Sequence, residues 1–91
     1  MIKIELKFDD DLEVLAGNDF GKSVFNGQLK NKFDMNDMNE LVFPDKIDMI
    51  CSSFVQGLFY EYLNKYPVEE IEKHIYIANE NHKEDVIEGL R

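Results

Sequence analysis

Two serines and a cysteine stand directly in front of the most apolar stretch of the chain, in the segment "CSSF" at 51–54. The spacing of the apolar residues that follow predicts a helix over 53–66. Serine is a preferred N-cap, because its hydroxyl accepts a hydrogen bond from the free N–H groups of the first turn. One serine, Ser52 or Ser53, is enough for the cap. The other is then free as a phosphoacceptor or as a contact for a partner, because the helix dipole favours a phosphate there.

Covalent catalysis has little support in the same residues. A nucleophilic serine or cysteine needs an adjacent base, and neither His74 nor His82 is near Cys51 in the sequence. We expect both histidines at the surface and interpret Cys51 as a small core residue. Nucleotide-binding glycine motifs and zinc motifs are lacking. The three aspartates at 9–11 fit a solvated turn better than a cation site. We therefore predict no enzymatic activity, no metal and no cofactor.

Three strands are predicted around these residues. Polar and apolar residues alternate over 1–8, and such alternation indicates a half-buried strand. A short apolar stretch at 12–15 is a second strand or a loop. The segment 40–44 is a buried strand that Pro44 ends, and 45–51 continues extended with Ile47, Met49 and Cys51 on one face. A further strand is expected at 74–79.

Helices are predicted between the strands. The first begins with Asn18 or Asp19 as its N-cap, although Gly21 and Gly27 each cost about 1 kcal/mol relative to alanine. Its apolar face consists of Phe20, Val24, Phe25 and Leu29. The second, over 53–66, ends before Pro67, and one or two helical turns follow at 68–74. A last helix, capped by Asn79 or Asn81, closes the chain with Val86, Ile87 and Leu90 on its apolar face.

The alternation of strands and helices indicates an α/β fold. A β-α-β-α-β-α order favours a small mixed or mostly parallel sheet with helices packed on it. The chain has 91 residues, which suits a single domain over 1–91.

Charge restricts the classes of partner. The net charge is −9, from 19 acidic and 10 basic residues, which argues against nucleic acid and against anionic membranes and permits a basic protein. No apolar run reaches the roughly 20 residues of a membrane span, no signal peptide is visible, and the single cysteine excludes an internal disulfide. We therefore expect a cytoplasmic protein. An alternative function follows from the charge alone: an acidic decoy or inhibitor of the phage type, with carboxylates aligned in a stripe that mimics nucleic acid.

Three pieces of the chain resemble a known family. They are "DFGKSVF" at 19–25, "LVFPDKIDMICSSFVQGLF" at 41–59 and "IYIAN" at 75–79. Together they look like the STAS-like family of unknown function and, more distantly, the STAS domains of bacterial anti-sigma-factor antagonists. Phe54, directly after the serines, is a feature of the STAS-like family that true antagonists lack. The resemblance implies a STAS-like regulatory domain that binds a protein, with a histidine-kinase-type ATPase as the kind of partner.

The antagonists also suggest roles for individual residues. Their loop reads aspartate, serine, serine or threonine, glycine, and an anti-sigma kinase phosphorylates the first serine. In this chain Cys51 takes the place of the aspartate, Ser52 that of the phosphoacceptor, Ser53 that of the next hydroxyl and Phe54 that of the glycine. A register shifted by one residue makes Ser53 the acceptor. The cysteine removes a charged neighbour and the phenylalanine adds a bulky one. The resemblance thus implies partner binding through the N-terminal end of the 53–66 helix, switched by serine phosphorylation, and leaves the oligomeric state open.

Overall fold

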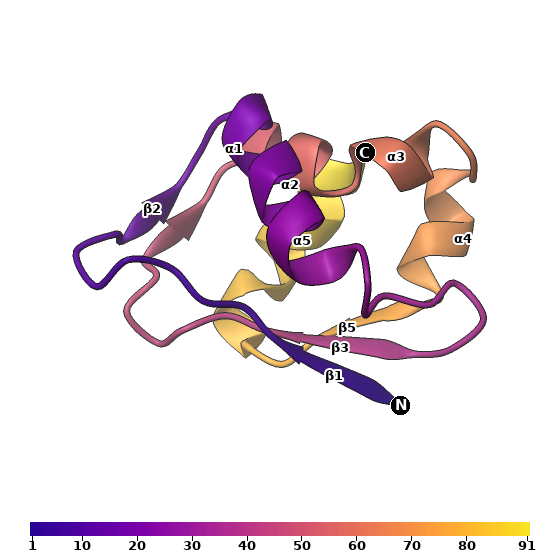
Figure 1. Ribbon diagram of the computed structural model, residues 1–91, viewed down its shortest axis with the longest axis horizontal. Coiled ribbons are helices and arrows are strands. Elements are labelled where there is room, and N and C mark those ends of the chain that lie inside the picture. Colours follow the sequence, from indigo (N-terminus) through magenta and orange to yellow (C-terminus); the bar gives the residue numbers. More distant parts are fainter.

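Three parallel strands form a sheet, and the helices pack on one side of it (Figure 1). The computed structural model describes all residues from Met1 to Arg91. The strand order is β1-β3-β5, where β1 is Ile2–Glu5, β3 is Asn39–Val42 and β5 is Ile75–Ile77. Both pairings are parallel, so the prediction of an α/β fold with a small mixed or mostly parallel sheet and helices packed on it is confirmed. Alternate side chains of these strands point into the core, as the period of two requires.

A separate pair of parallel strands lies beyond the ends of β1 and β3. β2 (Val14–Leu15) pairs with β4 (Met49–Ile50). The chain after β1 and the chain after β3 separate into loops and then pair again. The Lys46 ammonium donates to the carbonyls of Phe8 and Asp9 and so joins the two loops. Because of the pairing with β4, the apolar stretch at 12–15 contains a strand, but this strand has only two residues.

The inward face of β4 differs from the prediction. Ile47 and Ile50 are buried, whereas Met49 is 51% exposed. The expected face of Ile47, Met49 and Cys51 is therefore wrong. The reason is an irregularity between Ile47 and Met49: the N–H groups of Asp48 and Met49 both donate to the Glu13 carbonyl, at 2.7 and 3.3 Å, so this segment does not alternate like a regular strand.

The bounds and caps of several helices differ from the prediction. In chain order they are α1 (Asn18–Val24), the π-helix η1 (Phe25–Leu29), α2 (Ser52–Leu58), α3 (Tyr60–Leu63), α4 (Val68–Glu72) and α5 (Glu80–Leu90). The predicted 53–66 helix is broken at Phe59, whose φ of −107° and ψ of 15° are not helical. Gly17, not Asn18 or Asp19, is the N-cap of α1. Asn79 is the N-cap of α5 as predicted, but its side chain bonds the backbone of Phe43 instead of the helix.

Two glycines allow α1 and α2 to touch through their backbones. A Cβ at Gly21 would lie 2.2 Å from the carbonyl oxygen of Phe54, and a Cβ at Gly57 would lie 2.0 Å from that of Asn18. Gly21 therefore does not simply weaken its helix: the packing of α1 on α2 depends on it. A Cβ at Gly27, in contrast, would meet nothing within 4 Å.

The space between the sheet and the helices is filled by one cluster of 20 buried apolar residues. Phe54 belongs to this cluster, and the partly buried rings of Phe8 and Phe20 pack against it edge to face or tilted, with ring centroids 5.5 to 6.2 Å apart. At the start of the central strand, Asn39 is completely buried. Its amide group donates to the carbonyls of Asp34, Asp37 and His74 and accepts the Asp34 N–H. This side chain fastens two loops to the end of the sheet.

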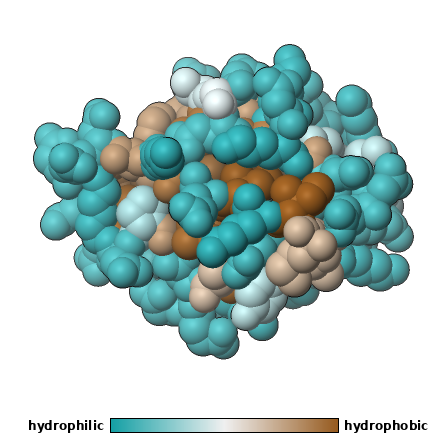
Figure 2. Space-filling model, turned by 60° about the horizontal axis from the view of Figure 1, so that its bottom comes forward, coloured by the Kyte–Doolittle hydropathy of each residue, from teal (hydrophilic) through white to brown (hydrophobic).

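The other face of the sheet carries no helix. Figure 2 shows it from below, with hydrophobic side chains in the middle and hydrophilic ones around them. The outward positions of β1 and β3 include Lys3, Glu5 and Glu40, and Tyr76 of β5 is 43% exposed. None of the helices combines the length and the hydropathy of a membrane-spanning segment.

Candidate functional site

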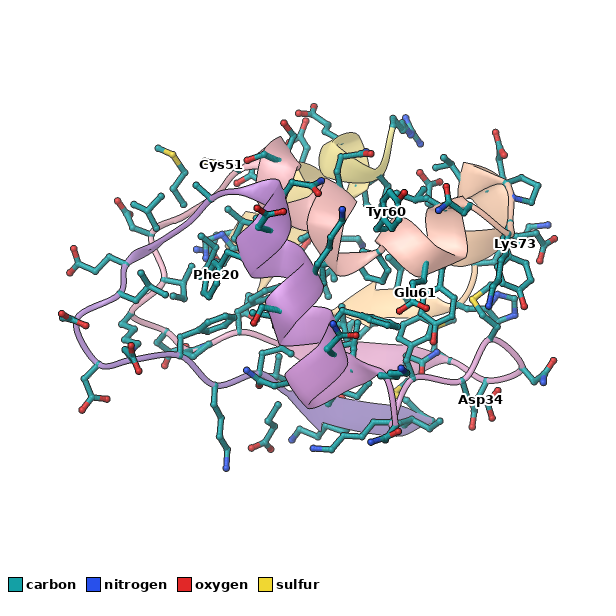
Figure 3. All side chains as sticks on the ribbon, turned by 45° about the horizontal axis from the view of Figure 1, so that its top comes forward. Phe20, Asp34, Cys51, Tyr60, Glu61 and Lys73 are labelled. Atoms are coloured by element: carbon teal, nitrogen blue, oxygen red, sulfur yellow. The ribbon has the colours of Figure 1, made fainter.

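The candidate site is the N-terminal end of α2, with Cys51, Ser52 and Ser53, and it follows β4 directly in the chain. The Cys51 N–H donates to the carbonyl of Leu15 at 2.8 Å and continues the pairing of β2 with β4. Cys51 is extended, with φ −84° and ψ 151°, and is the N-cap of α2. Figure 3 places it at the start of this helix, at the edge of the molecule. The expected burial of Cys51 is wrong, because the residue is only half-buried.

The serines are the first two residues of α2 and do not cap it. No side chain caps this helix. The Cys51 carbonyl accepts the N–H groups of Phe54 and Val55 at 3.1 and 3.3 Å, which moves the cap one residue before Ser52. The predicted serine cap is therefore wrong, and both hydroxyls are available for other contacts.

The two hydroxyls differ in what they contact. Ser53 Oγ accepts the N–H of Gly17 at 2.9 Å and so ties the start of α1 to the start of α2. Gly17 has a φ of 100°, a conformation that side chains rarely tolerate. Ser52 is exposed and takes part in no side-chain hydrogen bond of the chain. Ser53 thus has a structural contact, and Ser52 is free.

Phe54 is a core residue. Its side chain is completely buried, and its ring contacts those of Phe8 and Phe20. The prediction that Phe54 is a direct partner contact is therefore not supported by its position. Phe54 anchors the first turn of α2 and thereby positions the two serines.

An apolar surface leads up to the serines. Val14 and Met49 face each other in the pairing of β2 with β4, and they are 44% and 51% exposed. Ala16 lies two residues after Val14 and is exposed, and Cys51 lies two residues after Met49 and is half-buried. Alternation places these four side chains on one face, which we call the β2–β4 surface. The opposite face of the pair holds the buried residues Leu15 and Ile50. Sequence reasoning missed this surface because it assigned Met49 to the core.

Acidic residues border the β2–β4 surface. Glu13 and Asp48 directly precede the two strands, and Asp19 lies in the first turn of α1. All three are exposed, and none takes part in an ion pair. The nearest lysines along the chain are engaged elsewhere: Lys46 on the loop carbonyls and Lys22 over the ring of Tyr60. The surface is therefore apolar in the middle and negative at its border.

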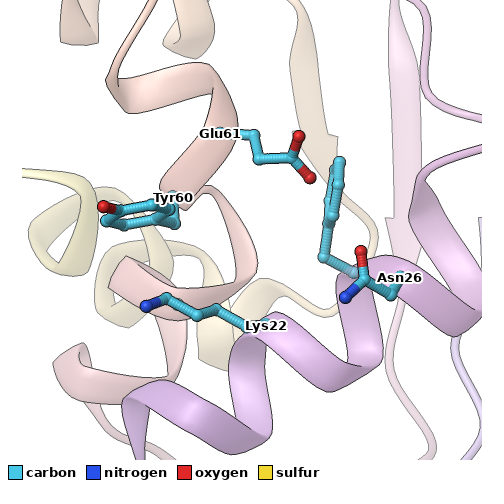
Figure 4. Close-up of a pocket in the computed structure, with 6 residues that line it drawn as sticks. Lys22, Asn26, Tyr60 and Glu61 are labelled. Carbon is cyan, nitrogen blue, oxygen red and sulfur yellow. The ribbon is translucent and has the colours of Figure 1, made fainter.

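A shallow hollow of about 190 Å³ lies where α2 gives way to α3. Figure 4 shows Lys22 and Asn26 from α1 and η1 facing Tyr60 and Glu61 across it. The Lys22 ammonium is 4.1 Å from the centre of the Tyr60 ring, a cation–π contact that links the two helical segments. The Lys22 ammonium is therefore already engaged in a contact within the chain.

The histidines do not assist the thiol. His82 is 2% exposed, so its predicted surface position is wrong. Its Nε2–H donates to the Ile47 carbonyl at 2.9 Å, and its Nδ1 is buried without a partner. His74 is half-buried and its Nδ1 lies 2.8 Å from the Glu70 carbonyl. Neither histidine hydrogen-bonds Cys51, and no three histidine, cysteine or acidic side chains are grouped as a metal site requires.

One tyrosine of the helical side has a perturbed pKa. Burial raises the pKa of Tyr62 above its ordinary value of 10.0, and the nearby carboxylate of Glu61 raises it further. The ring lies in a cluster with Phe25 and Phe33. The shift reflects packing at the edge of the core.

Comparison with protein families, with curated proteins and with solved structures finds no match to this chain.

Proposed function

We propose that this protein is a STAS-like regulatory module that binds a protein partner around the N-terminal end of α2, and that phosphorylation of Ser52 switches this binding. The observation that carries the proposal is the difference between the two serines. Ser53 is held by the Gly17 N–H, whereas Ser52 is exposed and unbonded at the end of an apolar surface. Of the two registers that the antagonists suggest, this difference favours Ser52 as the acceptor.

A phosphate on Ser52 would change binding without disturbing the fold. It adds nearly two negative charges to the first turn of α2, where the helix dipole favours them. It also places a strongly hydrated group beside Cys51 and the rest of the β2–β4 surface. A partner that covers this surface would have to dehydrate the phosphate, which costs free energy. We therefore expect the phosphorylated form to bind more weakly.

The partner is expected to be a histidine-kinase-type ATPase, as the family resemblance implies, and the module itself has no catalytic role in the proposal. The distribution of charge supports protein binding over the nucleic-acid decoy. Exposed carboxylates occur on the sheet, on the loops and on the helices, as at Glu5, Asp45 and Glu84. A decoy would need them aligned in one stripe.

The test compares charge at Ser52 with the same charge elsewhere. Tagged wild type, Ser52→Ala and Ser52→Asp would be recovered from the native host with their bound proteins, which quantitative mass spectrometry identifies. Ser23→Asp, an exposed serine on α1, is the matched control. Wild type, Ser52→Ala and Ser23→Asp should retain one common partner, and Ser52→Asp should lose it. Intact mass of the wild type should show a fraction with one phosphate and an unmodified fraction that retains the partner, and Ser52→Ala should show no phosphate. Equal recovery with Ser52→Ala and Ser52→Asp would refute the switch, and the absence of any partner would refute the module.

A further inference from the structure

The β2–β4 surface differs in composition from the rest of the outward-facing sheet. Its four outward residues, Val14, Ala16, Met49 and Cys51, are all uncharged, although 32% of the chain is charged. The outward positions of the main sheet are mixed: Lys3, Glu5 and Glu40 are charged, whereas Val42 and Tyr76 are not.

The fold does not need these apolar side chains where they are. Leu15 and Ile50 fill the inner face of the same two strands and are 0% and 3% exposed. α5 packs on that inner side of β4. Polar residues at the outer positions of Val14 and Met49 would leave the core unchanged. Val14 and Met49 are thus adjacent exposed apolar side chains that the core does not require, and adjacent exposed apolar side chains are a candidate surface for binding another molecule.

The border of the patch restricts what can bind it. Glu13, Asp48 and Asp19 are exposed and free of ion pairs, and the nearest lysines are held by other contacts. Carboxylates of this kind attract a basic surface during the approach of a partner, and they lower the affinity for an acidic one. A second copy of this chain would bring the same carboxylates and a net charge of −9, so self-association through this face is disfavoured. Nucleic acid is disfavoured for the same reason.

We propose that the partner of the module covers the β2–β4 surface with an apolar contact that is surrounded by lysine and arginine side chains. This inference rests on the proposed function and adds the place and the chemistry of the contact. The apolar residues at the centre of the interface would be buried on binding. The basic residues of the partner would meet the acidic border of this protein, which orients the partner and speeds association. Ser52 lies at the end of this surface, next to Cys51, so its modification would act directly at the edge of the interface.

Site-specific photo-crosslinking in the native host tests the place of the contact. A photoreactive phenylalanine analogue at position 49 would be compared with the same analogue at position 76. Met49 and Tyr76 have similar exposure, 51% and 43%, but Tyr76 lies on the main sheet. The proposal requires a protein to be crosslinked from position 49 and not from position 76.

The charge of the border is tested on the purified partner. Its dissociation constant would be measured at low and high salt for the wild type and for Glu13→Lys/Asp48→Lys. The control Glu84→Lys/Glu88→Lys changes the net charge equally on exposed positions of α5. The border variant should bind about tenfold more weakly at low salt, because two favourable charge contacts are reversed. Added salt should reduce the difference, and the control should bind like the wild type.

The outcomes separate this inference from the proposed function. A partner crosslinked from position 76 alone would overturn the inference and leave the module intact. A crosslink from position 49 to a second copy of the chain would overturn the choice of partner. Equal binding by the border variant and its control would refute the claim that lysine and arginine side chains of the partner surround the apolar contact. If neither position yields a crosslink and no protein is retained by the wild type, the proposed function fails as well.

Discussion

The contact between α1 and α2 makes Gly57→Ala the most informative stability variant. The added Cβ would lie 2.0 Å from the carbonyl oxygen of Asn18 and 2.8 Å from its carbonyl carbon. Both are backbone atoms, so no side chain can rotate away. Nonbonded atoms of this kind rest more than 3 Å apart. α1 and α2 must therefore separate by about 1 Å at the point where Gly21 also contacts Phe54.

The size of the effect follows from two opposing terms. Overpacking of a well-packed interface costs about 1–3 kcal/mol, and the upper end applies because backbone meets backbone. Alanine has a better helix propensity than glycine and returns about 1 kcal/mol. We expect a net loss of about 2 kcal/mol, a large part of the roughly 5–15 kcal/mol that stabilises a typical domain.

Urea unfolding followed by circular dichroism measures this loss. For a chain of this size a slope of about 1 kcal/mol per molar urea gives a decrease of the midpoint by about 2 M. Gly27→Ala is the matched control, because its Cβ would meet nothing within 4 Å and its φ is not positive. It should raise stability by about 0.5–1 kcal/mol. If the two variants shift the midpoint alike, the close contact of α1 with α2 is refuted.

Three further predictions concern single side chains. Ser53→Ala should lower the free energy of unfolding by about 1 kcal/mol, because it removes the acceptor for the Gly17 N–H, and Ser52→Ala should leave it unchanged in the same urea titration. Asn39→Ala should cost about 2 kcal/mol, because it leaves the Asp37 carbonyl and the Asp34 N–H without their partner and removes one of two hydrogen bonds from the carbonyls of Asp34 and His74; an unchanged midpoint would contradict this. The raised pKa of Tyr62 means that the folded state holds the phenolic proton more tightly than the unfolded chain. Its contribution to stability is therefore present below pH 10 and is lost at higher pH, and Tyr62→Phe should make unfolding less dependent on alkaline pH.

The strand and helix order could be predicted because it depends on local patterns. Alternation over 1–8 predicts β1, and the apolar stripe after Ser53 predicts α2. The end of the second helix could not be predicted in the same way. The stripe continues through Tyr62 and Tyr66, but the backbone leaves the helical region at Phe59, and Gly57 is the only residue of the predicted helix with a poor helix propensity near this break.

Caps and polar contacts were less predictable, because they depend on residues distant in the sequence. The hydroxyl of Ser53 bonds an N–H that lies 36 residues away. His82 was expected at the surface because it is polar. It stands four residues before Val86 and eight before Leu90, so the helical period already placed it on the buried face. Sequence alone could not show that the Ile47 carbonyl would accept its Nε2–H.

The order of the strands in the sheet also determines when the chain can fold. Ile2 pairs with Asn39, and Asn39 pairs with Ile75, so no strand finds its neighbour nearby in the chain. Such distant pairings form late, since a long segment must be ordered before any of them is made. β3 is the central strand, and its second partner, β5, follows it by more than 30 residues. During translation β1 and β3 are therefore available to pair with each other first, and one edge of β3 stays open until β5 has been synthesised.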